Sequence, residues 1–504
     1  MGVEYNKVFS APGSEKEGIV LRDMVLVLNF DDAASRCVTR KLRFERIYCK
    51  IIPGDTALEE IMAQEPLGLI VCGGAKGERP EGLDERVLRM ELPILALGDA
   101  AAALLLSLGG GVGERVYEGA VASLHYQENP LTQGIEACER LLPIARALQL
   151  PQGVNPICRA EDTVIGFAHE SRPLFGLQFQ PERNDMEGAM LLRNFALSVC
   201  GCTTWWDDDA FVTRAVEEIQ RVTGNGRAMC SMTGGITSGV SALLGFRALG
   251  SQLNCVFVDT GLLRDHESED FLSFYQDQIG MRIIRVSAEE RFLQSLKGVT
   301  RSEEKKRVIS ELMRRIIRET AEGLGKIDVV IRGTCYNDIM TGRVSMPLLA
   351  DETVPEIRPI RELFKDEIRR VGDYLGIPQE IVSRQPFPGS GLALRILGEV
   401  TPARLRILRA ADNIFRDEVK RSSAGKKLWQ YFAVLSPIPE SGEDAYVICL
   451  RAVNATERSL AYAARLPYEV TENTVERIMH LLPQVKRVIY DLTPSSNYAG
   501  IEWQ

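Results

Sequence analysis

Residues 93–103 read PILALGDAAAA, in which a short apolar run ends at Gly98 and a row of alanines follows Asp99. A bounded apolar run of this length is typical of a buried strand, and alanine is the strongest helix former. The stretch therefore predicts a strand, a sharp turn at Gly98 and a helix. Many α/β hydrolytic enzymes carry a nucleophile at such a corner, but glycine has no side chain to provide one.

The segments before this corner alternate between strand and helix patterns. Residues 24–30 (MVLVLNF) and 68–72 (GLIVC) are apolar runs, and residues 57–64 between them have a helical pattern. Alternation of this kind predicts a parallel sheet. The pattern breaks at residues 200–209, a cluster of turn formers and acids where we place a linker, with Trp205 and Trp206 expected to anchor it.

A second alternating set follows the linker. It extends to about Arg384, and a smaller α+β part follows from Gln385. The elements expected in the second set are a helix at 211–222, a strand at 229–232, a glycine turn at 233–239 and a helix at 240–246. The elements expected in the last part are helices at 402–419 and 475–482 and strands at 446–453 and 488–492.

The composition limits the class of protein. A chain of 504 residues that is 45% hydrophobic is long enough for about three domains with sizeable cores. A net charge of -9 and an isoelectric point near 5.4 argue against sequence-independent binding of nucleic acid. No apolar run approaches the roughly 18 residues that span a membrane, and the 11 cysteines follow no metal-site spacing. We therefore expect a soluble cytoplasmic protein with free thiols.

Two other features favour ordinary structural roles. The 4 histidines are widely spaced and match no metal or triad pattern, so no metal site is expected from them. The charged run at residues 302–307 (SEEKKR) is expected to be a solvated helix start. Ser302 is the expected N-cap, with the acids in the first turn.

Three blocks of sequence, in order, carry a family resemblance. They are residues 257–264 (FVDTGLLR), residues 362–367 (ELFKDE) with 384–399 (RQPFPGSGLALRILGE), and residues 487–493 (RVIYDLT) with 501–503 (IEW). With these blocks the chain resembles the GMP synthase family over nearly its whole length. The α/β organisation that this implies is an N-terminal tail at 1–23, a class I glutamine amidotransferase-like domain at 24–202, an adenine-nucleotide α-hydrolase-like ATP pyrophosphatase domain at 203–384 and a small α+β dimerisation domain at 385–504.

The resemblance marks the corner at Gly98 as the glutaminase position. The family has Gly-x-Cys-x-Gly there, and Phe-His-Pro-Glu where this chain has FQPE at residues 179–182. Glutamine hydrolysis needs a thiolate nucleophile and a histidine base, and Gly98 and Gln180 provide neither. Only the orienting carboxylate, Glu182, remains, so we predict no glutaminase activity. Cys72 is an alternative nucleophile, but a cysteine in a buried strand is usually a small hydrophobe.

The glycine turn at 233–239 (TGGITSG) is the expected nucleotide site. Glycines between a strand and a helix turn N–H groups inward, and the helix N-terminus favours an anion, although a purely structural turn has the same pattern. The turn resembles the family's Ser-Gly-Gly-x-Asp-Ser-Ser loop, with Thr237 replacing the aspartate and Gly239 replacing a hydroxyl donor. The resemblance implies ATP and Mg²⁺ as cofactors, with weaker magnesium dependence because a hydroxyl is a neutral ligand. The ATP and pyrophosphate contacts that it implies are Thr233, Gly234, Gly235, Ile236, Thr237, Ser238, Gly239, Asp259, Gly333 and Lys365.

The acceptor site is expected to be altered. Where the family has a flexible lid with histidines and a lysine, residues 340–351 are shorter and contain neither residue type. The C-terminal segment at 495–504 lacks the family's lysine, in a segment that helps hold the phosphate of xanthosine monophosphate (XMP). The acceptor contacts that the resemblance leaves are Arg395, Arg451 and Glu502.

Two functions therefore stay open. The first is the family reaction of purine nucleotide biosynthesis, XMP + ATP + amino donor to GMP + AMP + pyrophosphate, here at most with free ammonia. The second is a catalytically silent paralogue that acts as a nucleotide-binding regulatory or scaffold protein. Either is expected to be a homodimer built through the C-terminal domain, with ATP and XMP as small-molecule ligands and with no nucleic acid or membrane as partner.

Overall fold

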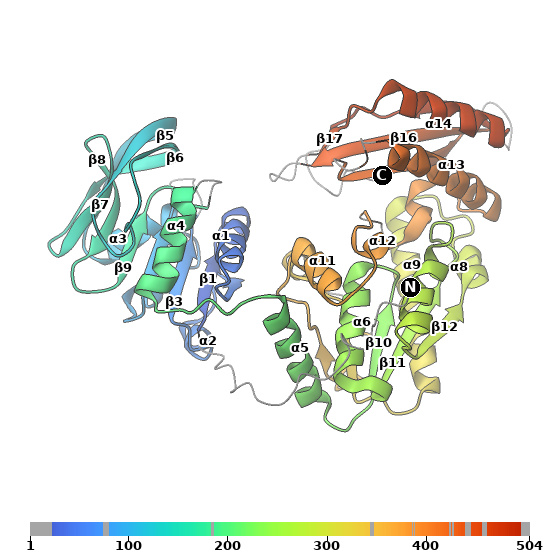
Figure 1. Cartoon of the computed structure of the whole chain (residues 1–504), viewed down its shortest axis with the longest axis horizontal. Coiled ribbons are helices and arrows are strands. Elements are labelled where there is room, and N and C mark those ends of the chain that lie inside the picture. Colours follow the sequence, from blue (N-terminus) through green and yellow to red (C-terminus); the bar gives the residue numbers. More distant parts are fainter. Residues whose placement is uncertain are drawn as a thin grey trace, which may run out of the picture. The chain divides into compact units, whose positions relative to one another are not determined.

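The structure is a computed structural model of the chain, and it describes residues 23–73, 80–182, 186–342, 347–385, 387, 389–422, 425, 428–438, 445–455 and 461–494. Contacts divide the chain into two compact units, an N-terminal unit that ends at Phe211 and a C-terminal unit that begins at Val212. Figure 1 labels the elements of both units. No described helix is both long and apolar enough to cross a membrane.

The N-terminal unit is built on one nine-stranded sheet with the strand order β2-β1-β3-β4-β9-β8-β7-β5-β6. The strands are β1 Val25–Asn29, β2 Cys49–Pro53, β3 Gly68–Cys72, β4 Ile94–Leu97, β5 Gly111–Tyr126, β6 Cys138–Gln149, β7 Val154–Ala160, β8 Thr163–His169 and β9 Leu174–Leu177. The first five strands in this order are parallel, as predicted, and the other four pair antiparallel. The sequence analysis assigned no elements to residues 111–169, where consecutive strands without intervening helices pair with each other.

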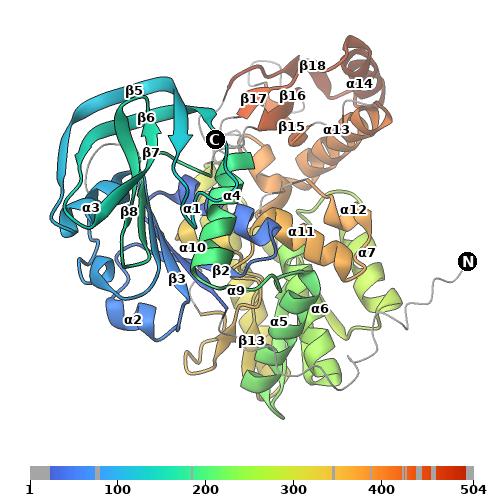
Figure 2. The same ribbon diagram turned by 60° about the vertical axis from the view of Figure 1, so that its left-hand side comes forward.

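Helices cover both faces of this sheet. They are α1 Asp32–Phe44, α2 Leu58–Met62, the 3₁₀ turn η2 Val87–Arg89, α3 Asp99–Ser107, α4 Met186–Asn194 and the π-helical turn η3 Phe195–Val199. Helices α1 and α4 lie on one face and α3 on the other (Figures 1 and 2). Helix α2 is shorter than the expected 57–64, since Glu65 follows with a positive φ of 50°.

The predicted linker at 200–209 is packed into the N-terminal unit. Cys200 and Cys202 belong to its hydrophobic core. Trp206 is 2% exposed, its backbone N–H donates to the Arg46 carbonyl at 2.9 Å, and its ring centroid lies 4.6 Å from that of Tyr48. Trp206 therefore anchors this segment, as predicted, to the N-terminal unit.

The C-terminal unit begins with a parallel sheet of order β12-β11-β10-β13-β14. Its strands are β10 Ala228–Met232, β11 Leu253–Asp259, β12 Ile283–Ser287, β13 Val329–Ile331 and β14 Glu356–Ile357. Its helices are α5 Asp208–Thr223, which enters from the N-terminal unit, α6 Ile236–Leu249, η4 Gly250–Gln252, α7 Glu267–Leu272, η5 Ser273–Gln278, α8 Glu289–Ser295, α9 Ser302–Gly323, α10 Tyr336–Met340, α11 Lys365–Tyr374, α12 Gln379–Val382 and η6 Gly391–Arg395. Helix α6 was expected to begin at Val240, but it begins at Ile236 and so includes half of the glycine turn.

The last part of the chain adds a four-stranded sheet with two helices, the predicted α+β arrangement. The elements are α13 Pro402–Arg421, β15 Gln430–Pro437, β16 Tyr446–Ala455, β17 Ala461–Ala463, α14 Tyr468–Leu481 and β18 Val485–Tyr490. Helix α14 and strand β18 start seven and three residues before the expected ranges. One hydrophobic core continues from β10 through α9 and α13 to β18, so the parts on either side of Gln385 pack as one body.

The charged run at the start of α9 differs from its prediction. Arg301 is the N-cap and makes no side-chain capping bond, and Ser302 is the first helical residue. Lys305 is 1% exposed, and its Nζ donates to the Ala393 carbonyl at 3.1 Å and to the Ile396 carbonyl at 2.6 Å. The prediction of a solvated helix start was therefore wrong at Lys305, where a packed neighbour supplies the hydrogen bonds that water would otherwise make.

Candidate functional site

Gly98 forms the corner between β4 and α3. Its φ of 61° and ψ of -127° lie in a region that side chains adopt only with strain, and its N–H donates to the Leu177 carbonyl at 2.8 Å. The corner has the sharp strand-to-helix geometry at which a nucleophile is exposed in other enzymes. Here the backbone geometry is present and the attacking group is not.

Gln180 and Glu182 follow β9, the strand next to β4, and both are buried. Arg140 on β6 fixes this segment: its Nη1 donates to the Gln180 carbonyl at 2.9 Å, and its guanidinium lies 4.8 Å from the Phe179 ring centroid. The chain thus brings Gly98 and Gln180 to neighbouring strand ends. An amide at residue 180 cannot exchange a proton with a nucleophile near neutral pH.

Cys72 ends β3 and pairs with Leu97 of β4. Burial raises the pKa of the Cys72 thiol well above its ordinary value, and the negative charge of Glu182 raises it further. The thiol therefore stays protonated, which fits the interpretation of Cys72 as a small hydrophobe and opposes its use as a substitute nucleophile.

The glycine turn connects β10 to α6 and is braced from within. The Ser238 hydroxyl donates to the Gly235 carbonyl at 2.9 Å and accepts from the Thr233 N–H at 3.1 Å. Gly234 has a φ of 80°, which glycine adopts without strain. Gly333 packs so closely that an added Cβ would lie 2.8 Å from the Ser238 nitrogen. The turn therefore offers backbone N–H groups and a helix N-terminus rather than the Ser238 hydroxyl.

Three residues that the sequence analysis did not select surround this turn. A Cβ added at Gly239 would overlap the hydroxyl of Tyr275, so the tyrosine occupies the space of a side chain at that position. The Arg384 Nη1 donates to the Gly234 carbonyl at 3.2 Å and pairs with Glu267 at 3.0 Å. Arg384 stands in a quoted motif, but no local pattern could have indicated Tyr275.

Asp259 ends β11 and faces a cation. Its Oδ2 accepts from the Arg285 Nη2 at 2.5 Å, and its Oδ1 accepts from the Gly261 N–H at 3.3 Å. Among the described residues, no group of three or more His, Cys, Asp and Glu side chains is placed to hold a metal ion. Mg²⁺ is usually held by one or two carboxylates together with substrate phosphates, so magnesium bound through ATP phosphates is compatible with these residues.

Lys365, the first residue of α11, lies near Cys335 at the start of α10. Burial raises the pKa of the Cys335 thiol to about 11, and the charge of Lys365 acts in the opposite direction. Gly333, two residues before Cys335, contacts the start of α6, and α11, whose first residue is Lys365, contacts α6 through Gly372.

Arg395 lies in a buried charged cluster. Its guanidinium lies 3.7 Å from Asp412 and 4.2 Å from the Phe432 ring centroid, and the Arg264 Nε donates to Asp412 at 3.1 Å. The Arg264 Nη1 and Nη2 are buried and have no hydrogen-bond partner within the described ranges, and the Arg264 guanidinium lies 4.2 Å from the Phe387 ring centroid. Burial alone would raise the pKa of Asp412, but Arg264, Arg395 and Arg416 hold it below its ordinary value. Sequence reasoning selected Arg395 and missed Arg264 and Asp412.

Arg451 and Glu502 are the other two expected acceptor contacts. Arg451 on β16 is buried, forms an ion pair with Asp491 and donates to the Thr493 carbonyl at 3.1 Å. Glu502 lies outside the described residues, as do residues 343–346 of the lid segment. The residues that follow are fixed, because the Arg318 guanidinium donates to the carbonyls of Pro347 at 3.2 Å and Leu348 at 3.0 Å.

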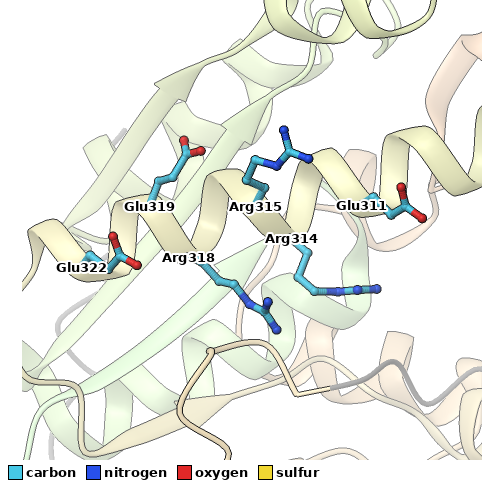
Figure 3. Close-up of a pocket in the computed structure, with 6 residues that line it drawn as sticks. All are labelled: Glu311, Arg314, Arg315, Arg318, Glu319 and Glu322. Atoms are coloured by element: carbon cyan, nitrogen blue, oxygen red, sulfur yellow. The ribbon is translucent and has the colours of Figure 1, made fainter.

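A shallow cavity of about 330 Å³ opens on the exposed face of α9. Its lining residues are Glu311, Arg314, Arg315, Arg318, Glu319 and Glu322 (Figure 3). Arg314 and Arg318 extend to one side of the helix, and Arg315 and Glu319 to the other. Arg318 donates a hydrogen bond to a carbonyl of the lid segment, and Glu319 pairs with Arg291 at 2.8 Å. None of the predicted site residues lines this cavity.

Comparison with known proteins places these sites in a class. The sequence profile of class-I glutamine amidotransferases matches residues 26–199, and that of the GMP synthase C-terminal domain matches residues 417–503. The fold and these matches define a protein of the amidotransferase-linked synthetase class.

Curated relatives make the assignment specific. The chain is 36% identical to the GMP synthase (glutamine-hydrolyzing) of Symbiobacterium thermophilum, over 96% of this chain and 99% of that protein. It is also 36% identical to the GMP synthase of Caldicellulosiruptor saccharolyticus, with the same coverage of both chains. The chain belongs to the GMP synthase family. Among solved structures, a glutamine amidotransferase from Thermotoga maritima is 15% identical, with a TM-score of 0.29 over 35% of this chain and 97% of that one.

Proposed function

We propose that this protein is an ATP-dependent synthetase that aminates XMP with free ammonia and does not hydrolyse glutamine. The relatives, named glutamine-hydrolyzing GMP synthases, support the reaction class. The observation that carries the proposal is the difference between the two sites. The nucleotide turn keeps its backbone cradle, whereas the amidotransferase corner has Gly98 and Gln180 in place of reactive groups.

The N-terminal unit supports the loss of the glutaminase half-reaction. Attack on the glutamine carboxamide requires a thiolate, and the leaving ammonia requires a proton from a base that has just accepted one. Gly98 cannot attack, Gln180 cannot transfer a proton, and the thiol of Cys72 is held protonated by its burial. Ammonia must then reach the synthetase site from solution.

The C-terminal unit supports ATP binding. The N-terminus of α6 presents N–H groups and a positive dipole end to an anion, and Gly234 and Gly235 let the backbone approach it closely. Lys365 and Arg384 add positive charge in this region. Magnesium would arrive on the ATP phosphates, because Asp259 is paired with Arg285 and Thr237 offers only a neutral hydroxyl.

The buried arginine cluster supports an anionic acceptor. Arg264 and Arg395 both pair with the carboxylate of Asp412, and the positive charges of Arg264, Arg395 and Arg416 lower the pKa of that carboxylate. Buried charge is stable only when it is paired, and the free Nη1 and Nη2 donors of Arg264 can receive phosphate or carbonyl oxygens of a nucleotide.

The test is release of pyrophosphate by the purified full-length protein. With ATP, magnesium, ammonium and XMP we expect pyrophosphate and GMP in equal amounts, and no product when XMP is omitted. Replacing ammonium with glutamine should give no GMP and no glutamate above a protein-free blank. GMP formation driven by glutamine would contradict the proposal.

A catalytically silent, nucleotide-binding dimer is the second candidate. It is favoured by the internal pairing of residues expected to contact ligands: Asp259 with Arg285 and Arg451 with Asp491. The result that selects it is binding of ATP by calorimetry together with no pyrophosphate release at any ammonium concentration.

A further inference from the structure

Tyr275 is a buried residue with no role in the sites described so far. It lies in the π-helical turn η5, is 0% exposed, and its hydroxyl has no hydrogen-bond partner in the described part of the chain. A buried hydroxyl without a partner destabilises the protein, and a phenylalanine would avoid that cost. Burial raises the pKa of Tyr275, so the hydroxyl keeps its proton and is available as a donor.

The hydroxyl is directed at the first turns of α6. A Cβ at Gly239 would overlap it, so the oxygen lies where a side chain on that helix position would begin. Gly239 is the fourth residue of this 14-residue helix and the last residue of the glycine turn, so the hydroxyl lies beside the N-terminal turn of α6. π-Helical turns are found frequently at functional sites.

Arg384, Cys230 and Cys255 all lie close enough to act on this hydroxyl, and of these three the Arg384 guanidinium is the group that favours an anion. The Arg384 guanidinium donates to the Gly234 carbonyl at 3.2 Å, and its positive charge also acts on the Tyr275 hydroxyl. The Ser238 hydroxyl donates to the Gly235 carbonyl and is already used inside the turn. The Ser238 hydroxyl is therefore already used within the turn, and Tyr275 supplies a hydroxyl from a different element.

We propose that Tyr275 is an anion-positioning residue of the glycine turn, donating its hydroxyl proton to a phosphate oxygen of a nucleotide or pyrophosphate bound at the N-terminus of α6. The pair Gly239 and Tyr275 acts as one unit, in which the glycine makes room and the tyrosine supplies the donor. This inference rests on the proposed function, because it assumes that the turn binds ATP.

The test is a calorimetric titration of the full-length protein with inorganic pyrophosphate and with ATP, comparing wild type with Tyr275→Phe. Hydrogen bonds to charged groups are strong, so we expect both ligands to bind the variant about tenfold more weakly. The melting temperature of the ligand-free variant should be equal to or above that of wild type, because the unpartnered hydroxyl is gone. Affinity equal to wild type would overturn the proposal.

Two further variants separate positioning from general packing. Ser241→Ala removes another buried α6 hydroxyl that has no partner in the described residues, away from the turn, and should leave both affinities unchanged. Gly239→Ser combined with Tyr275→Leu also removes the ring carbon that would lie 2.9 Å from the new Cβ, moves a hydroxyl back onto the helix and should recover most of the affinity lost in Tyr275→Leu alone. Equal weakening by Ser241→Ala, or no recovery in the double variant, would contradict the inference. Failure of wild type to bind either ligand would overturn the proposed ATP site as well.

Discussion

Gly98 keeps the backbone of a nucleophile corner without its side chain. A residue with a Cβ at this φ and ψ costs about 1–3 kcal/mol, which an enzyme accepts only in exchange for catalysis. Once the nucleophile is not needed, glycine is the more stable residue at the corner. A glutamine at residue 180 fits the same explanation, because its amide can form hydrogen bonds in a buried position without having to exchange a proton.

Restoring the nucleophile alone should restore strain but not activity. We expect Gly98→Cys to lower the free energy of unfolding by about 1–3 kcal/mol in a denaturant titration. Glutamate production should stay at the level of the blank, since the new thiol has no base. Gly98→Ala is the matched control and should show the same loss of stability. Glutaminase activity in Gly98→Cys would show that another residue replaces the histidine.

At the scale of elements, Lys305 joins α9 to the segment that contains η6. Its ammonium is buried against two carbonyls, and burial lowers its pKa to about 8, with Arg404 as a further cause. In the unfolded chain a lysine titrates near 10.4, so at pH values between these two the unfolded state binds more protons. This linkage makes stability rise as the pH rises from about 8 to about 10.4, and the full penalty applies below pH 8.

Replacement of Lys305 should remove this pH dependence. We expect wild type to become more stable relative to Lys305→Met as the pH rises from 8 to 10, measured as the difference between their free energies of unfolding. Lys306→Met serves as the control, because Lys306 is a solvent-accessible neighbour paired with Glu303 and should show no such trend. A pH-independent difference for Lys305→Met would show that the side chain titrates as it does in water.

At the scale of the whole molecule, the last part of the chain presents apolar side chains to solvent. Met479 and Leu481 on α14, Ile489 on β18 and Leu492 just beyond it are 42%, 56%, 41% and 69% exposed. Exposed apolar residues gathered on adjacent elements are typical of an interface. Because an interface is held by folding and assembly, it can persist whether or not chemistry does.

We expect a homodimer through this surface. Light scattering of the full-length protein at micromolar concentration should give twice the chain mass of 56.0 kDa. Ile489→Asp should give a monomer that keeps its melting curve shape, since a buried charge opposes association more than it affects an exposed strand position. Phe44→Asp, at an exposed position of the N-terminal unit, should remain dimeric. A monomeric wild type would contradict this expectation.

The sequence by itself determined the alternation of strands and helices around Gly98 and the family of the chain. Through the family resemblance it also predicts positions where reactive residues are replaced. These inferences depend on local residue patterns and on the order of the motifs, and the amino-acid sequence contains both in full. The starts of α6, α14 and β18 were misjudged by three to seven residues, because the ends of elements are decided by packing partners that local propensity does not contain.

Only the tertiary structure decided which polar groups meet. The sequence pattern predicted a solvated Lys305, but the fold places the Ala393 and Ile396 carbonyls against its ammonium group. Arg264 pairs with Asp412, which lies 148 residues later in the chain. The overlap of Tyr275 with Gly239 arises in the same way, from elements that are distant in sequence. Burial and partner choice are properties of long-range contacts, and a buried polar group takes its pKa and its role from those contacts.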